Sequence, residues 1–173
     1  MCFVSCSIER PNSMKTILLV DDNRYIIEAL ALTLDSHATG GNILKLKAPN
    51  GREGADILNS IPVDLILTDL DMPVMDGYGL IEHRNRRFPH VPVVVATGDA
   101  SPDVIGRLHA MGVTECLEKP FDFDAAAHLI LKKLARHQDR PGPLPHAAVV
   151  PATVEGHAQD FTNSSPNLHQ TVT

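Results

Sequence analysis

Residues 64–77 read DLILTDLDMPVMDG, and this stretch carries most of the information about the fold. It begins with an apolar run typical of a short β-strand, followed at once by the carboxylates of Asp69 and Asp71. Asp76 and Gly77 then begin a segment with helical spacing of apolar residues. A strand that is apolar on both faces indicates a parallel sheet with helices on both sides. The stretch therefore predicts one strand-to-helix unit of an α/β domain.

The same alternation of strand and helix extends outward from this stretch in both directions. Five apolar runs have the length of strands: residues 16–20, 42–48, 64–68, 91–96 and 113–117. Five segments show helical spacing: residues 23–37, 50–60, 76–88, 101–111 and 122–137. On the third helix, Arg84, Arg86 and Arg87 are predicted to face outward. With right-handed crossovers, this order predicts an α/β fold with a doubly wound, five-stranded parallel sheet, as in flavodoxin-like proteins.

Length and composition agree with a globular domain and exclude several classes of protein. The chain has 173 residues, of which 43% are hydrophobic and 21% charged, a balance typical of proteins with an apolar core. No apolar run approaches the length of a transmembrane helix, and the first residues lack the basic start of a secretory signal. Three cysteines are too few for a disulfide framework, which predicts a reducing, cytoplasmic location. The net charge of −6 argues against direct binding to nucleic acid.

The two ends of the chain differ in composition from its middle. Residues 1–13 are predicted to form a disordered leader, and residues 14–137 the folded domain. Residues 138–173 are rich in proline and show neither helical nor strand spacing, which predicts a disordered tail. Because this tail has no helix-turn-helix pattern and is short for a second catalytic domain, we expect a domain that acts without an attached output domain.

Polar residues stand at the ends of four predicted strands. Asp21 and Asp22 follow the first strand, Asp69 the third, Thr97 the fourth and Lys119 the fifth. Because ligands bind at the carboxyl ends of parallel strands, we expect these side chains to converge. Carboxylates at close range repel each other by about 4 kcal/mol per pair, unless a cation lies among them. Mg²⁺ prefers such oxygen ligands, and a neighbouring ammonium and hydroxyl suit a transferred phosphoryl group.

Four segments together resemble the receiver domains of two-component response regulators. They are ILLVDDN at residues 17–23, DLILTDLDMPVMDG at 64–77, VPVVVATGD at 91–99 and CLEKPF at 116–121. The resemblance covers about residues 15–137, and the combination is far more specific than any one segment. It implies a phosphoprotein of phosphorelay signal transduction that catalyses its own phosphorylation and dephosphorylation, rather than an enzyme with a separate substrate.

The resemblance also implies roles for the acidic residues. Asp69 would be the phosphoacceptor, and the donor would be a sensor histidine kinase or a histidine phosphotransfer protein. Mg²⁺, or Mn²⁺ in its place, would be held by the carboxylates of Asp21, Asp22 and Asp69 and by the backbone carbonyl of Asp71. Output would pass through altered contacts with a downstream protein target, which the sequence does not name.

The resemblance extends to the later strand ends, with one departure. Thr97 would bind a phosphoryl oxygen, and Lys119 would pair with the phosphoacceptor and then with the phosphate. The Lys119–Pro120 bond is expected to be cis, as is common in the family. The family usually has an aromatic residue three positions before the lysine, where this chain has Cys116. Because cysteine cannot gate a cavity as a ring does, we expect output to depend on backbone shifts near residues 97–101 and in the following helix.

Two alternatives accompany this interpretation. A degenerate receiver would bind partners without phosphorylation; Cys116 favours that alternative, whereas the intact acid cluster argues against it. The Asp-Leu-Asp triplet at residues 69–71 also resembles the nucleophile motif of haloacid dehalogenase-type phosphohydrolases. That motif normally lies on an early strand with its acid pair downstream of the lysine, whereas Asp21 and Asp22 lie upstream here.

Overall fold

The computed structural model describes residues 14–38 and 42–136 of the chain. The predicted leader, residues 1–13, and the predicted tail, residues 138–173, lie outside the described residues, so the disorder expected of both stays a prediction. Within the part of the chain that is described, no helix combines the length and the apolar surface that crossing a bilayer requires.

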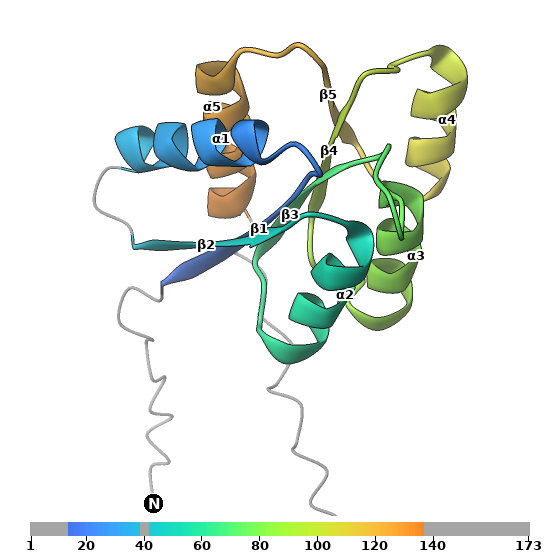
Figure 1. Ribbon diagram of the computed structural model, residues 1–173, viewed down its shortest axis with the longest axis horizontal. Helices are drawn as coiled ribbons and strands as arrows, with labels where there is room; N and C mark the ends of the chain where they lie inside the picture. Colours follow the sequence, from blue (N-terminus) through green and yellow to red (C-terminus); the bar gives the residue numbers. More distant parts are fainter. Residues whose placement is uncertain (1–13, 39–41, 137–173) are drawn as a thin grey trace, which may run out of the picture. The chain divides into compact units, whose positions relative to one another are not determined.

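The described residues form one sheet of parallel strands in the order β2-β1-β3-β4-β5 (Figure 1). The strands are β1 (Lys15–Val20), β2 (Ile43–Ala48), β3 (Leu65–Asp69), β4 (Val93–Thr97) and β5 (Glu115–Glu118). The helices are α1 (Arg24–His37), α2 (Gly51–Ser60), α3 (Gly77–Arg87), α4 (Pro102–Ala110) and α5 (Phe123–Arg136). This confirms the predicted doubly wound, flavodoxin-like fold, and each element lies close to its predicted position.

Helices cover both faces of the sheet, and each face has its own apolar cluster (Figure 1). Successive side chains of a strand point to opposite faces, so neighbours in β1 enter different clusters. Leu18 lies in the cluster beneath α2, α3 and α4, together with Leu80. Ile17 lies in the cluster beneath α1 and α5, together with Leu30 and Ile130. The central strands β3 and β4 are buried along their whole length, which explains their continuous apolar sequences.

The helices differ in how firmly their first turns are capped. Asn50, Asp76 and Asp122 each accept a hydrogen bond from a backbone N–H three residues later, which satisfies a free donor of α2, α3 and α5. Ser101 stands at the same position before α4, but its side chain makes no capping hydrogen bond. The first residue of α4 is Pro102, which lacks an N–H and is favourable there. Helix α4 therefore begins without a side-chain cap.

The prediction that Arg84 faces outward is wrong. Arg86 and Arg87 are exposed as predicted, but Arg84 is only 8% exposed. Arg84 follows Leu80 and Ile81 by four and three positions, so it lies on the same face of α3 as these two core residues. The side of α3 on which Arg84 lies therefore follows from helical spacing and not from the charge of its side chain.

Candidate functional site

The carboxyl ends of four strands bring the predicted polar residues to one edge of the sheet. Asp69 and Thr97 are the last residues of the neighbouring strands β3 and β4. Asp21 directly follows β1, on the other side of β3, and Lys119 directly follows β5. Three of these four side chains are almost fully buried: Asp21 is 1% exposed, Asp69 6% and Thr97 0%. The site is therefore built on strand ends, with most of these polar side chains buried.

Lys119 joins the two buried carboxylates. Its Nζ donates to Oδ2 of Asp21 at 2.7 Å and to Oδ2 of Asp69 at 2.6 Å. Asp21 and Lys119 are 98 positions apart in sequence, so only the parallel order of the strands brings them together. A shared ammonium offsets part of the repulsion between the two carboxylates, which would otherwise be large in a buried site.

Backbone N–H groups hold the remaining oxygens of both carboxylates. Oδ1 of Asp69 accepts from the N–H of Leu70 at 2.7 Å, and Oδ1 of Asp21 accepts from the N–H of Asn23 at 2.8 Å. Each carboxylate is thus bonded through one oxygen to Lys119 and through the other to the backbone. Both groups are fixed in orientation by the loops that follow their strands.

Burial and hydrogen bonding affect the pKa values of Asp21 and Lys119 differently. Burial raises the pKa of the Asp21 carboxyl above its ordinary value, although its hydrogen bonds with Lys119 and the N–H of Asn23 act to lower it. Burial acts to lower the pKa of Lys119, but its hydrogen bonds to Asp21 and Asp69 and their negative charges outweigh burial and raise it. The ammonium of Lys119 is therefore firmly charged at neutral pH, and the site contains a permanent cation.

Three carboxylates at this edge have the arrangement that a small divalent cation requires. Oxygens of Asp21, Asp22 and Asp69 all lie within 4.8 Å of one another. Asp22 is exposed, whereas the other two are buried, so the cluster opens to solvent at Asp22. Hard carboxylate oxygens in a partly open site are the donors that Mg²⁺ prefers, because Mg²⁺ keeps some of its water. The residues present therefore fit the predicted magnesium ion.

Asp71 and Thr97 are joined to the site through different atoms. Asp71 is exposed, and its N–H lies 3.4 Å from Oδ1 of Asp69, so only its backbone adjoins the carboxylate cluster. Oγ1 of Thr97 accepts from the N–H of Asp99 at 3.2 Å. The carbonyl of Thr97 accepts from the N–H of Lys119 at 2.7 Å, which ties the end of β4 to the segment that positions the lysine. The Lys119–Pro120 bond is cis, as expected.

The loop after Asp69 contains two features that position the site. A Cβ at Gly77 would lie 2.0 Å from the carbonyl oxygen of Asp69, so only glycine allows α3 to begin so close to β3. Val74 has a φ of 69° and lies between Pro73 and Met75, whose carbonyl and N–H are joined by a 2.8 Å hydrogen bond. A β-branched residue is strained in this conformation. Sequence reasoning missed this strained turn, because valine has no preference for it.

Cys116 occupies β5 beside the apolar cluster beneath α4. Its side chain is partly buried, and burial followed by the charge of Glu118 raises the pKa of the thiol. An aromatic side chain does contact α4, but it comes from α3 and not from the position of Cys116. Arg107 of α4 lies over the ring of Tyr78 of α3, 3.7 Å from its centroid. Leu108 is the one fully buried residue of α4, and Val104 and Ile105 pack partly buried against the same apolar cluster. The cation–π contact adds to this packing between α3 and α4.

Comparisons with known proteins agree with this geometry. Residues 17–131 match the family model of the response regulator receiver domain. The DNA-binding transcriptional regulator NtrC of Klebsiella pneumoniae is 29% identical over 125 residues, which cover 72% of this chain and 26% of NtrC. The transcriptional regulatory protein GlrR of Escherichia coli is 37% identical over 110 residues, which cover 63% of this chain and 24% of GlrR. The chain thus spans about a quarter of the length of these relatives.

Two solved structures of receiver proteins are matched over nearly their whole length. The chemotaxis response regulator CheY4 of Vibrio cholerae has 28% identity and a TM-score of 0.60, covering 72% of this chain and 99% of CheY4. The CheY-like receiver domain protein of Methanospirillum hungatei has 25% identity and a TM-score of 0.66, covering 73% of this chain and 98% of that protein. With the family model, the fold and the acid cluster in agreement, this chain belongs to the response regulator receiver domain family.

Proposed function

We propose that Asp69 accepts a phosphoryl group from the phosphohistidine of a sensor histidine kinase or a histidine phosphotransfer protein. The observation that supports this most directly is the environment of its carboxylate. Asp69 is 6% exposed, its Oδ2 is 2.6 Å from the ammonium of Lys119, and its oxygens lie with those of Asp21 and Asp22. A buried carboxylate among other acids and one lysine serves no purpose in packing, but it suits a nucleophile toward phosphorus.

The transfer uses the ionised carboxylate of Asp69. One of its oxygens forms the new bond to phosphorus as the bond from phosphorus to the histidine nitrogen breaks. The electron pair of the broken bond stays on that nitrogen, which takes up a proton. Since the ammonium of Lys119 lies 2.6 Å from Oδ2, it stabilises the charge that spreads over the phosphoryl oxygens. Because the residues are held by strand ends, catalysis consists mainly of positioning and charge stabilisation.

Asp21, Asp22 and Asp69 would hold Mg²⁺, and the backbone carbonyl of Asp71 is proposed as a further ligand. When bound, the ion would supply positive charge that offsets repulsion between the acids and the phosphoryl oxygens. Without it, Lys119 is the cation that hydrogen-bonds Asp21 and Asp69. Phosphorylation should therefore depend strongly on added divalent cation.

Signalling is proposed to follow from the new charge on Asp69. A phosphoryl group adds roughly −1.5 to −2 units of charge, by analogy with other phosphorylated side chains. Thr97 would exchange its bond to the N–H of Asp99 for a phosphoryl oxygen, which moves the loop leading into α4. Helix α4 has no side-chain cap and buries only Leu108, so it yields readily to such a shift. The altered surface of α4, β5 and α5 would then bind a downstream protein.

The test is phosphorylation by acetyl phosphate, followed on a phosphate-affinity gel. We expect a Mg²⁺-dependent shifted band that Asp69→Asn abolishes, because the amide oxygen is a poor nucleophile. Asp103→Asn is the matched control: it removes the same charge from an exposed side chain of α4, outside the acid cluster, and should keep the band. Thermal unfolding of each variant verifies that it is folded.

Other outcomes would favour the two alternatives. Folded wild-type protein that gives no band with any donor, while still binding a partner, would be a degenerate receiver acting as an adaptor. Continuous release of phosphate from p-nitrophenyl phosphate, lost in Asp69→Asn, would indicate a phosphohydrolase of the haloacid dehalogenase type. A band that persists in Asp69→Asn would refute the assignment of the phosphoacceptor.

A further inference from the structure

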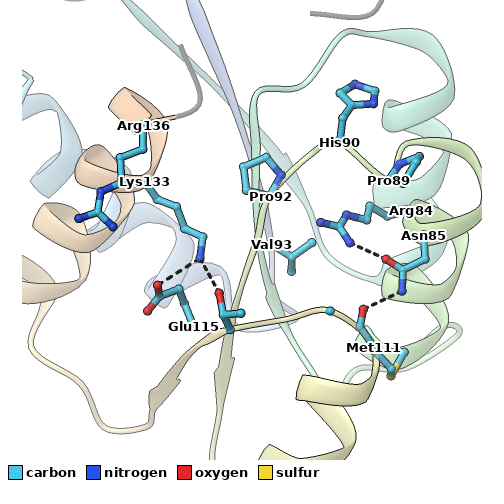
Figure 2. Close-up of a pocket in the computed structure, with 12 residues that line it drawn as sticks. Arg84, Asn85, Pro89, His90, Pro92, Val93, Met111, Glu115, Lys133 and Arg136 are labelled. Carbon is cyan, nitrogen blue, oxygen red and sulfur yellow. Dashed lines mark hydrogen bonds and ion pairs between the residues drawn. The ribbon is translucent and has the colours of Figure 1, made fainter. Parts of the chain in front are cut away.

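A cavity of about 590 Å³ lies where β4 begins, at the opposite end of this strand from Thr97 (Figure 2). Its walls come from the end of α3, the residues before β4, the turn after α4 and the end of α5. Its volume is in the range of pockets that bind small organic molecules. Pro92, Val93 and Met111 contribute an apolar part of the lining.

Arg84, the one of the three α3 arginines that is buried, lines this cavity (Figure 2). It is 8% exposed, and its Nε donates to the carbonyl of Val91 at 2.5 Å. Its Nη1 donates to Oδ1 of Asn85 at 2.5 Å. Both acceptors are neutral, and among the described residues no carboxylate forms an ion pair with Arg84. A buried cation without a counter-charge is unfavourable, and an anion in the cavity would supply one.

The opposite wall, on α5, carries further positive charge. Lys133 and Arg136 both line the cavity, and Figure 2 shows them across it from Arg84. Lys133 Nζ lies 3.2 Å from Oε1 of Glu115 and 3.1 Å from Oγ1 of Thr114. Among the described residues that line the cavity, Glu115 is the one carboxylate, against the three cations of Arg84, Lys133 and Arg136. The cavity therefore has an excess of positive charge in a chain whose net charge is −6.

Asn85 fixes the geometry of the Arg84 side of the cavity. Its Oδ1 accepts from Arg84, and its Nδ2 donates to the carbonyl of Met111 at 2.8 Å. The guanidinium is thus held between α3 and the turn after α4 before any ligand binds. A planar guanidinium in a fixed orientation is well suited to the oxygens of a phosphate group, and a lysine opposite adds a point charge.

We propose that this cavity binds a phosphate-bearing small organic anion. Arg84 would bind the phosphate from the buried side, Lys133 and Arg136 would neutralise it from α5, and the apolar lining would contact the rest of the molecule. Such a ligand would bridge α3, the turn after α4 and α5. It would bind independently of phosphorylation at Asp69, because Arg84 and the acid cluster stand at opposite ends of the sheet.

The first experiment is a nuclear magnetic resonance titration of the full 173-residue chain, labelled with ¹⁵N, using inorganic pyrophosphate and then adenosine monophosphate without Mg²⁺. We expect saturable shifts of the amides of Val93, Gly112 and Thr114, which line the cavity. Amides near Asp69 should stay unchanged, because the acid cluster repels both probes. Binding should weaken as salt is added, because it depends on charge. Shifts confined to the acid cluster, or no saturable shift with either probe, would overturn the proposal.

The second experiment compares two neighbouring lysines of α5. Lys133 lines the cavity, whereas Lys132 is exposed and does not, so Lys133→Ala and Lys132→Ala remove the same charge from adjacent positions. We expect Lys133→Ala to weaken binding by about fivefold and Lys132→Ala by less than about twofold. Equal effects would mean general attraction to the surface and would refute a built site.

The third experiment addresses the purely structural role that Arg84 has through its bond to Val91. Arg84→Lys keeps the charge but removes the planar fork, so binding should weaken by about tenfold. Wild-type affinity in this variant would contradict recognition by the guanidinium. If this variant unfolds, the comparison of Lys133 with Lys132 still decides the question, because both side chains lie on the surface of α5.

Discussion

Replacing Gly77 with alanine tests how the fold positions the phosphoacceptor. Gly77 is the first residue of α3, and its N–H donates to the carbonyl of Leu70 at 2.9 Å. A Cβ at this position would lie 2.0 Å from the carbonyl oxygen of Asp69 and 2.9 Å from Cα of Leu70. Because these are backbone atoms, no side-chain rotation relieves the clash. The start of α3 would have to move by about 1 Å to reach the 3.0 Å that real Cβ atoms keep.

The free energy follows from three contributions. Forcing a methyl group into a packed contact costs about 1–3 kcal/mol. Lengthening the hydrogen bond from Gly77 to Leu70 costs about 1 kcal/mol more. The lower conformational entropy of alanine in the unfolded chain returns about 0.4–1 kcal/mol. We therefore expect Gly77→Ala to lower the free energy of unfolding by about 1–3.6 kcal/mol and the melting temperature by about 10 °C.

Urea denaturation measures this change, and Gly106→Ala is the matched control. Gly106 lies inside α4, and a Cβ there would meet no atom within 4 Å. The same substitution at Gly106 should stabilise the protein by about 0.5–1 kcal/mol, because alanine favours helices. We expect the free energy of unfolding to fall in Gly77→Ala and to rise in Gly106→Ala. A midpoint for Gly77→Ala at or above that of the wild type would refute the steric argument, and equal losses in both variants would place the cause outside the contact with Asp69.

Three further predictions concern Lys119, Cys116 and the contact between α3 and α4. Lys119→Met leaves the buried carboxylates of Asp21 and Asp69 without their shared cation, so it should destabilise the Mg²⁺-free protein by about 3 kcal/mol in urea, whereas Lys132→Met should change little. Since burial and then Glu118 raise the pKa of Cys116, less of it is thiolate at any pH below that value. To measure Cys116 alone, the other two cysteines are replaced by serine. Alkylation of Cys116 by iodoacetamide at pH 8.5 should then be slower than that of glutathione and should accelerate with rising pH. A rate equal to that of glutathione would contradict the raised pKa. A double-mutant cycle of Tyr78→Leu and Arg107→Ala should give a coupling of about 0.5–1 kcal/mol, and a value near zero would show that the cation–π contact does not hold α4.

Much of the fold follows from local sequence pattern. The apolar runs and the helical spacing predicted every described strand and helix, because burial on both faces requires continuous apolar strands and burial on one side requires a helical repeat. The position of the acid cluster was also predictable. Asp21, Asp69 and Thr97 stand at strand ends, and parallel strands bring their carboxyl ends to one edge.

Other features of the site depended on how distant elements pack. The resemblance implied that Lys119 pairs with Asp69, as the structure has it. Its second bond, to Asp21, comes from the placement of β5 beside β4 and of the segment after it. Val74 adopts a positive φ that its residue type disfavours, so local preference was overridden by the loop between β3 and α3. The cation–π contact between Tyr78 and Arg107 joins two helices whose relative position no single helical pattern contains.

By itself, the sequence determined the order of the elements, the edge of the sheet at which the carboxylates gather and the resemblance to receiver domains. These depend on periodicity and on residues adjacent in the chain, which a sequence displays directly. Only the tertiary structure decided that Arg84 is buried and that it shares a cavity with Lys133 of α5. Helical spacing places Arg84 on the same face of α3 as Leu80 and Ile81. It does not show which segments cover the end of that face, because this depends on what another part of the chain places against it.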